Sequence, residues 1–570
     1  MLVSLCFAVY LPGLFTTPPI DRDEARFAQA SRQMFESVAL PEADRDTRPL
    51  SISDTGEVTG GFHAGGLVVP MVQDVPRLNK PPLIYWLQAG SAWACTRGDP
   101  LADAIWMYRL PSVAGSIAAV LATYWMGRRM FTRPVALLGA SLLGVCAVVV
   151  FDAHQARADQ VLLGLTTVSM ALLWSLVRGA RFGRRRPALT WLALWTTVGL
   201  GVLVKGVSPV VVFSTLVAMG VFGGSWSAWQ AARPIVGLVV VAALIAPWAL
   251  GVAQRVGFET YVSIVFDETV ARGSQAKEGH VGPPGYHVAF LWAVFWPGTI
   301  AVLLGLAWAW RRWMAWGRPG SRWRTRRPGA PAVFFLVCWI VPTWVFFELY
   351  ATKLPHYVLP TYPAVALLAA RGVLAASPGR GLRKAGAVIF GLVGVGVGGA
   401  GVVGAVTMDL LRPSAWMIVP ASVALIVCVG LTARLAWSGR SHRSAAAAVL
   451  CMIPLAWVVH AGILPSLTRF SPRLVERLAR HDDGVRPIGA AGYHEDSLIF
   501  LTRGRAVRVV HTDAAAWLDR HPGGLLFARR LYRDEGGLDD GSFVTIDSLT
   551  GFQFASSDTV TVDFVEAAPR

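Results

Sequence analysis

Long apolar runs recur along most of this 570-residue chain, and they limit what it can fold into. Each run holds roughly 17–22 residues, the length that an α-helix needs to cross a bilayer. Inside lipid every backbone N–H and C=O must be paired within the segment, so such runs form helices. We therefore predict an all-α polytopic membrane protein with about thirteen transmembrane helices. The runs lie at residues 2–18, 108–127, 134–151, 160–177, 188–204, 207–223, 235–254, 288–310, 332–350, 355–371, 385–407, 415–433 and 445–465.

The net charge of +17 indicates topology rather than nucleic-acid binding, because the bases are unevenly placed. Basic gaps between apolar runs alternate with gaps that hold the acids, and the positive-inside rule places the basic gaps in the cytoplasm. An odd number of spans then puts the N-terminus in the cytoplasm and the C-terminus outside. Six gaps hold bases and no acids, at 128–133, 178–187, 224–234, 311–331, 371–384 and 434–443.

Three regions are not spans, and all three fall on the predicted outer side. They are an external loop at 19–107, a second loop at 255–287 and a tail at 466–570. In the tail, short apolar runs alternate with helix-like stretches, which predicts a small C-terminal α/β domain after a membrane domain at 1–465.

The first external loop contains two expected juxtamembrane helices. Apolar residues from Phe27 to Val38 follow helical spacing with a polar opposite face, which is typical of an amphipathic helix lying on the membrane surface. A second candidate covers 81–95. Between them, the Gly-, Asp- and Thr-rich insert at 42–76 is expected to be a mobile loop. The six cysteines show no CxxC spacing, so neither a disulfide framework nor a zinc site is indicated.

Lysine placement points to an anionic ligand on the outer face. The chain has only five lysines, and Lys80, Lys205, Lys277 and Lys353 all fall on that face, against the positive-inside trend. Compact ammonium groups at the water–lipid boundary suit a phosphate or pyrophosphate. The alternative is a chance distribution with side chains that snorkel to the interface.

Carboxylates near the outer boundary are the candidate acid–base groups. Asp21 and Glu24 have the spacing of a capping box that would open the first juxtamembrane helix, and this alternative explains Asp23 less well. Asp159 precedes the fourth span and could itself be a helix-start acid. If Asp23 and Asp159 converge, one could act as a general base while the other orients the acceptor.

An ordered set of short motifs resembles the aminoarabinose transferase and protein mannosyltransferase-like family of polyprenyl-phosphate glycosyltransferases. Each motif alone is weak, but the order of the set is specific, and the resemblance covers about residues 1–465. The matching stretches are 23–28 (DEARFA), 80–87 (KPPLIYWL), 109–112 (RLPS), 156–159 (ARAD), 205–206 (KG), Arg272 with His280, Pro283 and Tyr286, and 353–360 (KLPHYVLP).

The resemblance implies a GT-C fold and an inverting glycosyltransferase. A sugar would leave a polyprenyl (undecaprenyl) phosphate donor for lipid A, another envelope lipid, a glycan or a protein on the periplasmic face of the bacterial inner membrane. It further implies that Asp23 and Asp159 are catalytic. Donor-phosphate contacts would come from Lys80, Arg272, Tyr357, Lys205 and Lys353, with support from Glu24, Arg26, Arg157, His280 and Tyr286.

Two departures and two rival functions complete the prediction. Asn79 stands where the family usually has an acid that helps to hold a divalent ion, so a metal cofactor is left open, and Phe27 replaces a common Tyr.

A lipid-linked-sugar transporter or flippase would use the same charges, but it would be expected to carry inverted repeats and mid-membrane charges. A non-catalytic scaffold would leave the motif set unexplained.

Overall fold

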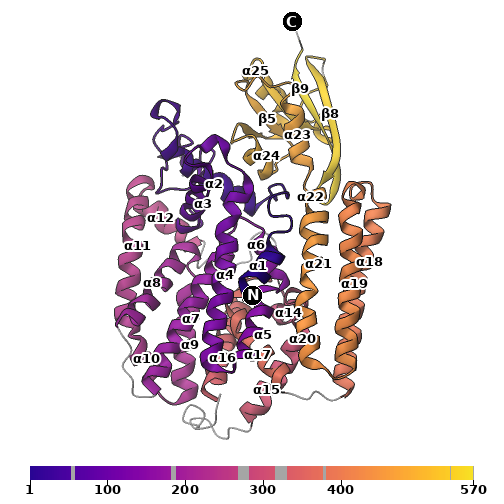
Figure 1. The fold of residues 1–570 in the computed structure, drawn as a ribbon. Coiled ribbons are helices and arrows are strands. Elements are labelled where there is room, and N and C mark those ends of the chain that lie inside the picture. Colours follow the sequence, from indigo (N-terminus) through magenta and orange to yellow (C-terminus); the bar gives the residue numbers. More distant parts are fainter. Residues whose placement is uncertain are drawn as a thin grey trace.

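The computed structural model describes residues 1–52, 58–181, 188–267, 282–314, 330–375, 380–539 and 541–568. A tall helical bundle carries two smaller units side by side on its upper end (Figure 1). One unit is the loop region before α4, and the other is the C-terminal domain. The bundle helices are α1 (Leu2–Tyr10), α4 (Ile105–Met130), α5 (Arg133–Gly144), α6 (Ala147–Ala153), α7 (Asp159–Arg181), α8 (Ala188–Lys205), α9 (Ser208–Gly223), α10 (Ser227–Ala232), α11 (Pro234–Val256), α12 (Phe258–Phe266), α14 (Tyr286–Val294), α15 (Thr299–Met314), α16 (Ala330–Leu349), α17 (Tyr362–Ala375), α18 (Arg380–Thr407), α19 (Ala415–Trp437), α20 (Ser441–Leu450), α21 (Met452–Ala456) and α22 (Leu464–Leu467).

The outer surface of the bundle suits a lipid environment. Large apolar side chains on its peripheral helices are exposed, such as Val239 on α11, Leu392 on α18 and Val427 on α19. Within the described residues, eight helical segments are long and apolar enough to cross a membrane, and the bent pair α5–α6 makes a ninth. Helices α9, α15 and α17 are apolar but shorter. The protein is therefore a multi-spanning membrane protein, although this structure does not confirm a count of thirteen spans.

Two predicted spans are broken. The run at 134–151 forms α5 and α6, which meet at an angle of 55°. The hydroxyl of Tyr10 donates to the carbonyl of Gly144 at the break, over 2.9 Å, and so satisfies one of the carbonyl groups left free at the end of α5. The run at 288–310 forms α14 and α15, separated at Pro297, which cannot donate a helical hydrogen bond.

The first predicted span, 2–18, is wrong in extent. Helix α1 has nine residues and is about 14 Å long, roughly half of a hydrocarbon core. After Tyr10 the chain turns at Gly13, whose positive φ of 79° and tight contact with the backbone of His460 leave no room for a side chain. The segment from Leu14 to Pro18 then turns its carbonyl groups toward Arg109.

Both juxtamembrane helices form, as α2 (Asp23–Ala39) and α3 (Leu83–Thr96). However, the polar face of α2 does not face water as predicted. Arg32 is 3% exposed and forms an ion pair with Asp103 at 2.7 Å. Gln33 donates to two loop carbonyls, and the C-terminal domain packs over the same face. Long-range partners therefore replace the water that the amphipathic pattern predicted.

The 42–76 insert is folded wherever the structure describes it. It forms two short antiparallel hairpins, β1 (Ser51–Ile52) with β2 (Val58–Thr59) and β3 (Met71–Val72) with β4 (Val75–Pro76). The side chain of Gln73, in the turn between β3 and β4, donates to the carbonyls of Gly504 and Ala506 in the C-terminal domain, each over 2.9 Å. The insert thus links the first loop to the tail.

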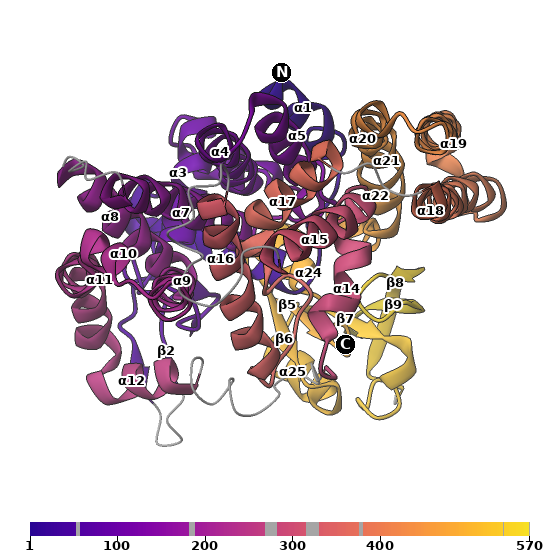
Figure 2. The ribbon, with the colours of Figure 1, turned by 90° about the horizontal axis from the view of Figure 1, so that it is seen from below.

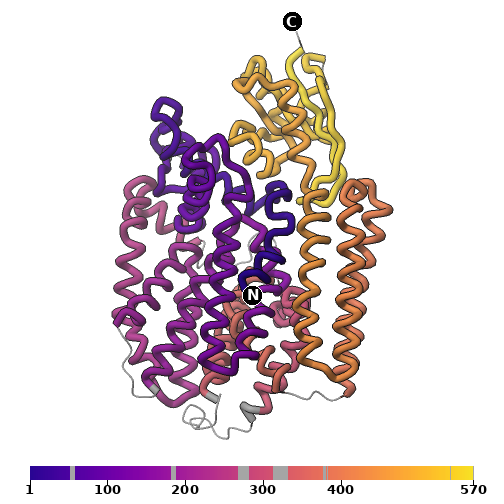
Figure 3. The backbone as a smooth tube through the Cα atoms, viewed as in Figure 1, coloured from indigo at the N-terminus to yellow at the C-terminus, as the bar shows by residue number. Residues whose placement is uncertain are grey.

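The tail forms a five-stranded mixed sheet with short helices against it. The strand order is β6-β5-β7-β9-β8, with parallel pairing of β5 with β6 and β7 and antiparallel pairing of β9 with β7 and β8. The tube in Figure 3 follows the chain from the bundle into this unit through α22. Its elements are α23 (Phe470–Leu478), β5 (Ile488–Ala491), α24 (Asp496–Leu501), β6 (Ala506–Val509), α25 (Ala514–Arg520), β7 (Leu525–Arg529), β8 (Phe543–Gln553) and β9 (Asp558–Ala567).

Candidate functional site

Two adjoining cavities meet at the upper end of the bundle, beneath the C-terminal domain. The first, here called the polar chamber, has a volume of about 720 Å³ and is lined mainly by charged and amide side chains. The second, here called the apolar channel, has a volume of about 230 Å³ and continues between Leu162, Val207, Val210 and Phe346. Five residues line both cavities and are here called the threshold: Lys80, Asp159, Lys205, His356 and Tyr357.

The threshold forms because antiparallel helices bring distant motifs to one level. Helix α7 begins at Asp159, and its neighbour α8 ends at Lys205. Gly206 follows with a φ of +74°, the left-handed conformation that commonly terminates a helix. A cation in the last helical turn is also favoured by the helix dipole. The KG motif therefore both ends α8 and presents Lys205 to the start of α7.

Asp159 is the most densely paired carboxylate of the threshold. Its side chain is 8% exposed, and its Oδ1 lies 2.5 Å from Lys205 Nζ and 3.8 Å from His356 Nε2. Burial, together with the charges of Arg157 and Lys205, lowers the pKa of His356 to about 3, although Asp159 opposes this shift. His356 is therefore a neutral imidazole at neutral pH, and Lys205 supplies the charge that balances Asp159.

Asp23, the first residue of α2, projects into the polar chamber with a side chain that is 52% exposed. Its carboxylate lies 3.4 Å from Arg157 Nη2 and 3.7 Å from Arg77 Nη2. Burial of the rest of the group would raise its pKa, but the guanidiniums of Arg157 and Arg77 outweigh burial and lower it. Asp23 is thus ionised at neutral pH and accessible to a molecule in the chamber.

Arg157 connects the two candidate catalytic carboxylates. Its guanidinium lies 3.4 Å from Asp23, 3.7 Å from Asp159 and 3.6 Å from the buried Asp152. Burial would lower the pKa of Arg157, but these carboxylates raise it. The guanidinium therefore stays charged and fixes the distance between Asp23 and Asp159, which is a positioning role.

Glu24 is buried and turned away from the reacting groups. Its carboxylate accepts two hydrogen bonds from Arg109, at 2.8 and 3.0 Å, and two from the backbone N–H groups of Ile20 and Ala156, both at 2.8 Å. Arg109 also donates to the carbonyls of Leu14, Thr17 and Pro18. This network ties α2, α4 and the loop before α7 together. Glu24 therefore lines the polar chamber, but its carboxylate is engaged by these donors and has a supporting role.

The capping-box interpretation of Asp21 and Glu24 is wrong. The N-cap of α2 is Arg22, which has a φ of 67° and forms no capping hydrogen bond through its side chain. Asp21 instead accepts the backbone N–H of Ser497 at 2.8 Å, in the C-terminal domain. Burial and the neighbouring Glu495 raise the pKa of Asp21 to about 8.

Arg26 likewise belongs to the contact with the C-terminal domain. Its Nε lies 2.8 Å from Asp496 Oδ2, and Asp496 also pairs with Arg508. Asp496 and Arg508 line a neighbouring cavity, which shares Arg26, Arg77 and Asn79 with the polar chamber. The C-terminal domain therefore lies beside the chamber and holds residues that line it.

Two of the remaining predicted site residues fall elsewhere, and two more lie outside the described residues. Lys353 lines neither of the two cavities, because its ammonium contacts Glu348 at 3.4 Å and the carbonyl of Pro283 at 3.2 Å. Lys353 therefore does not belong to the threshold in this structure, and its predicted contact with the donor phosphate stays a prediction. Tyr286 packs against Phe290, with ring centroids 4.5 Å apart, and also lies outside both cavities. Arg272 and His280 lie outside the described residues.

Sequence reasoning missed Arg77 and gave His356 no role. Arg77 is 10% exposed, lies over the ring of Phe27 at 4.7 Å and donates to the hydroxyl of Tyr85 at 3.1 Å. It falls at the end of a Gly-rich insert, where no motif marks it. His356 stands inside the 353–360 motif, so its position could have suggested a role.

The side chains around Asn79 do not fit a divalent cation. Across the described ranges, no group of three His, Cys, Asp or Glu side chains is arranged to hold a metal ion. The chamber wall beside Asn79 carries Arg77, Lys80 and Arg157, whose charges oppose a second cation. The sequence does not decide whether a metal cofactor binds, and the mechanism proposed below uses none.

Comparisons with known proteins place these features in context. Residues 79–250 match the family described as dolichyl-phosphate-mannose-protein mannosyltransferase. The undecaprenyl phosphate-alpha-4-amino-4-deoxy-L-arabinose arabinosyl transferase of Erwinia tasmaniensis is 27% identical over 409 residues, 69% of this chain and 63% of that protein. A second such transferase, from Sodalis glossinidius, is 27% identical over 65% of this chain and 59% of its own length. The matches thus span about three fifths of these curated relatives.

A solved structure shares the whole fold. The crystal structure of ArnT from Cupriavidus metallidurans bound to undecaprenyl phosphate aligns with a TM-score of 0.71, covering 99% of this chain and 97% of that one, at 17% identity. This likeness shows that the chain has the fold of a multi-spanning helical membrane protein with a small C-terminal sheet domain. Its sequence is similar to the named arabinosyl transferases and, over residues 79–250, to the mannosyltransferase family.

Proposed function

We propose that this protein transfers a sugar from an undecaprenyl-phosphate donor to an acceptor hydroxyl in the polar chamber. One observation carries the proposal: a chamber with an exposed carboxylate opens into an apolar channel, and the two meet at the ammonium groups of Lys80 and Lys205. A lipid phosphate needs cations and its chain needs an apolar groove, whereas a sugar and its acceptor need a polar space. The names of the relatives support this donor class.

The geometry supports a single displacement with inversion. In the chamber, Asp23 would accept the proton of the attacking hydroxyl as its oxygen bonds to the anomeric carbon. The bond from that carbon to the phosphate oxygen breaks, and the phosphate leaves with the electron pair. Lys80 and Lys205 stand at the threshold to stabilise the charge that develops on the leaving phosphate. Asp159 would keep Lys205 in place, and Tyr357, whose ring lies 5.7 Å from Lys205 Nζ, would border the phosphate.

We further propose that the chamber faces the periplasm of a bacterial inner membrane. The basic gaps lie at the opposite end of the bundle, where α4 ends at Arg128 and Arg129 and α18 begins at Arg380. The N-terminus would then be cytoplasmic and the C-terminal sheet periplasmic. Alkaline phosphatase fused after residue 568 should be active, and a fluorescent protein fused there should stay dark. The reverse result would contradict this orientation.

The relatives' names also suggest substrates to test first. We propose 4-amino-4-deoxy-L-arabinose as the sugar and lipid A as the acceptor, and a deletion strain should lose the corresponding lipid species in mass spectra of its envelope.

In proteoliposomes holding both substrates, Asp23→Asn should slow transfer by about 100-fold or more, because the general base is lost. Asp409→Asn, at an exposed carboxylate outside the chamber, is the matched control. Unchanged transfer by Asp23→Asn would refute the assigned base, and donor translocation without transfer would favour the transporter.

A further inference from the structure

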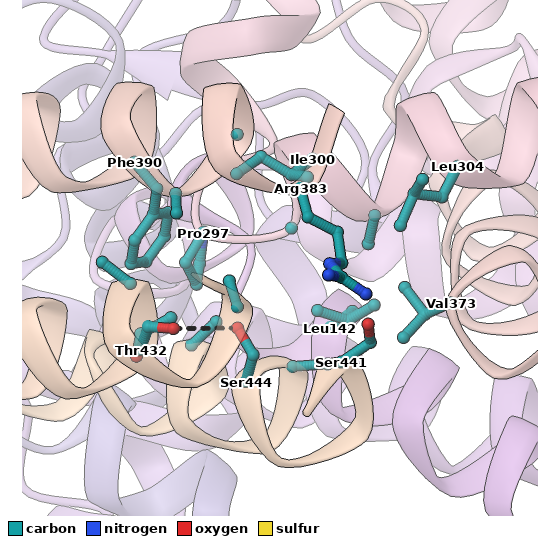
Figure 4. Close-up of a pocket in the computed structure, with 18 residues that line it drawn as sticks. Leu142, Pro297, Ile300, Leu304, Val373, Arg383, Phe390, Thr432, Ser441 and Ser444 are labelled. Atoms are coloured by element: carbon teal, nitrogen blue, oxygen red, sulfur yellow. Dashed lines mark hydrogen bonds between the residues drawn. The ribbon is translucent and has the colours of Figure 1, made fainter. Parts of the chain in front are cut away.

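A separate cavity lies in the lower half of the bundle, away from the chamber and the channel. It has a volume of about 80 Å³ and lies between α18, α19 and α20 on one side and α15 and α17 on the other (Figure 4). Its walls are mostly apolar, with Ile300, Leu304, Val373 and Phe390 among the lining side chains. None of the five threshold residues lines it.

The α18–α19 hairpin stands at the edge of the bundle, which explains why a cavity is left beside it. Figure 2 shows the two helices set apart from the remaining ones, and α20 and α21 join them to the bundle through α19. Small residues continue the wall where the hairpin faces the core, including Gly386 and Ala387 on α18 and Ala445 on α20. Side chains of the protein therefore do not fill the space between the hairpin and the core.

A cationic side chain points into this apolar space. Arg383, in the first turn of α18, directs its guanidinium toward Leu142 and Ser441 in Figure 4. Its Nε is fully buried and has no hydrogen-bond partner among the residues that the structure describes. Gly439, with a φ of +81° at the turn between α19 and α20, packs so closely that a Cβ there would lie 3.0 Å from Arg383 Nη1. The turn thus accommodates the guanidinium without neutralising it.

The surrounding sequence supplies no anion for this guanidinium. No Asp or Glu occurs between Glu348 and Asp409, or between Asp409 and Glu476. Two further bases, Arg440 and Arg443, directly adjoin the lining residues Ser441 and Ser444 in the sequence. A partly buried, uncompensated guanidinium is costly, so an anionic partner from outside the chain would be bound favourably.

Hydroxyl groups beside Arg383 complete a polar mouth on an apolar cavity. Ser441 and Ser444 both line it, and Ser444 donates to the carbonyl of Thr432 at 3.0 Å, which fixes its side chain against the wall (Figure 4). From Arg383 to Phe390 the wall of α18 runs about 10 Å into the bundle. A lipid with an anionic head group at this polar end would therefore place its apolar tail along this wall.

We propose that this cavity binds an anionic diacyl phospholipid, with the phosphate beside Arg383 and an acyl chain against Ile300 and Phe390. Basic pockets between membrane helices bind anionic lipid head groups in this way. The lipid would fill the gap beneath the α18–α19 hairpin and hold the hairpin to the core. In the orientation proposed above, it belongs to the cytoplasmic leaflet, on the side opposite the donor.

The test is lipid binding by the purified full-length protein. After delipidation in neutral detergent, phosphatidylglycerol should bind with one molecule retained in native mass spectra and should raise the melting temperature. Phosphatidylcholine and inorganic phosphate should do neither. Arg383→Gln should weaken phosphatidylglycerol binding by about tenfold or more, in line with about 1.4 kcal/mol per decade. Lys384→Gln, whose ammonium lies over the Trp437 ring at 4.6 Å, should bind like the wild type.

A second pair of variants tests the apolar part of the site without changing charge. Ala387→Phe places a ring in the cavity, whereas Val388→Phe adds the same ring at a position that is 48% exposed on the outer face. The first should abolish phosphatidylglycerol binding and the second should not. Wild-type binding by Arg383→Gln or Ala387→Phe, or equal protection by phosphatidylcholine or inorganic phosphate, would overturn the proposal. Because the readout is binding, neither outcome depends on sugar transfer.

Discussion

Lys205 Nζ lies 2.5 Å from Asp159 Oδ1, and this contact joins the end of α8 to the start of α7 at the threshold between the two cavities. The ammonium therefore has two tasks, since it neutralises a buried carboxylate and faces the space proposed for the donor phosphate. A cation that is already held by a carboxylate needs little reorganisation when phosphate charge develops.

We predict that Lys205→Ala lowers both stability and transfer, whereas Lys205→Arg retains the fold and part of the activity. Removal of the ammonium leaves Asp159 buried without its main partner, which is destabilising. The double variant Asp159→Asn with Lys205→Gln should recover the melting temperature of the wild type but stay about 100-fold slower in transfer. Thermal unfolding and proteoliposome kinetics measure the two effects. Recovery of activity in the double variant would show that Lys205 has only a structural role.

The Glu24–Arg109 pair is predicted to govern folding rather than chemistry. Both side chains are at most 1% exposed, and breaking a buried ion pair costs about 3–5 kcal/mol. Glu24→Gln and Arg109→Met should therefore sharply reduce the amount of folded protein recovered in detergent. Arg412→Ala is the control, because it removes an exposed pair whose contribution is about 0–1 kcal/mol. Normal yield and melting temperature for Glu24→Gln would contradict the network described above.

The contact between Asp21 and the C-terminal domain should make stability depend on pH. Burial and Glu495 raise the pKa of Asp21 from 3.8 to about 8, so the folded state favours the protonated carboxyl. Ionisation of Asp21 therefore lowers the free energy of unfolding. This loss of stability is absent below pH 3.8, grows as pH rises and is complete above about pH 8. Asp21→Asn keeps an acceptor for the N–H of Ser497 and cannot ionise. It should raise the melting temperature at pH 8, by about 2–4 °C for each kcal/mol recovered, and leave it unchanged near pH 4.

A suitable control for that experiment is Asp44→Asn, at an exposed position in the first loop. Calorimetry or tryptophan fluorescence at both pH values gives the comparison. An equal shift at pH 4 and pH 8 would mean that the substitution acts through packing rather than through the charge on Asp21.

The sequence predicted the threshold better than the surroundings of α2. Asp159 and Lys205 each adjoin an apolar run whose length fixes where its helix begins or ends, so positive-inside patterning and short motifs place both at the outer boundary, although they do not show that the two meet. Arg32 and Gln33 were predicted to face water, because nothing local to α2 indicates that the C-terminal domain, more than 430 residues away, covers them. Arg503 reaches back to Glu36 at 2.8 Å, a contact that no local pattern encodes.

Arg77 was missed for a related reason and leads to a prediction about pH. It is one of the two guanidiniums that lower the pKa of Asp23, so its loss should move that pKa upward. A general base must be deprotonated, and activity is lost as pH falls through its pKa. In Arg77→Ala the acidic limb of the pH profile of kcat/KM should therefore shift to higher pH. In the wild type this limb should lie at a pH below the ordinary pKa of an aspartate.

Two further variants separate charge from shape at this position. Arg77→Lys keeps the charge but cannot maintain the planar contact with Phe27 and Tyr85, so it should restore the pH profile more fully than it restores the rate. Arg48→Ala, which removes an exposed cation paired within the 42–76 insert, should change neither. If Arg77→Ala slows transfer equally at every pH, Arg77 acts on the shape of the chamber and not on the charge of Asp23, and the general base must be sought elsewhere.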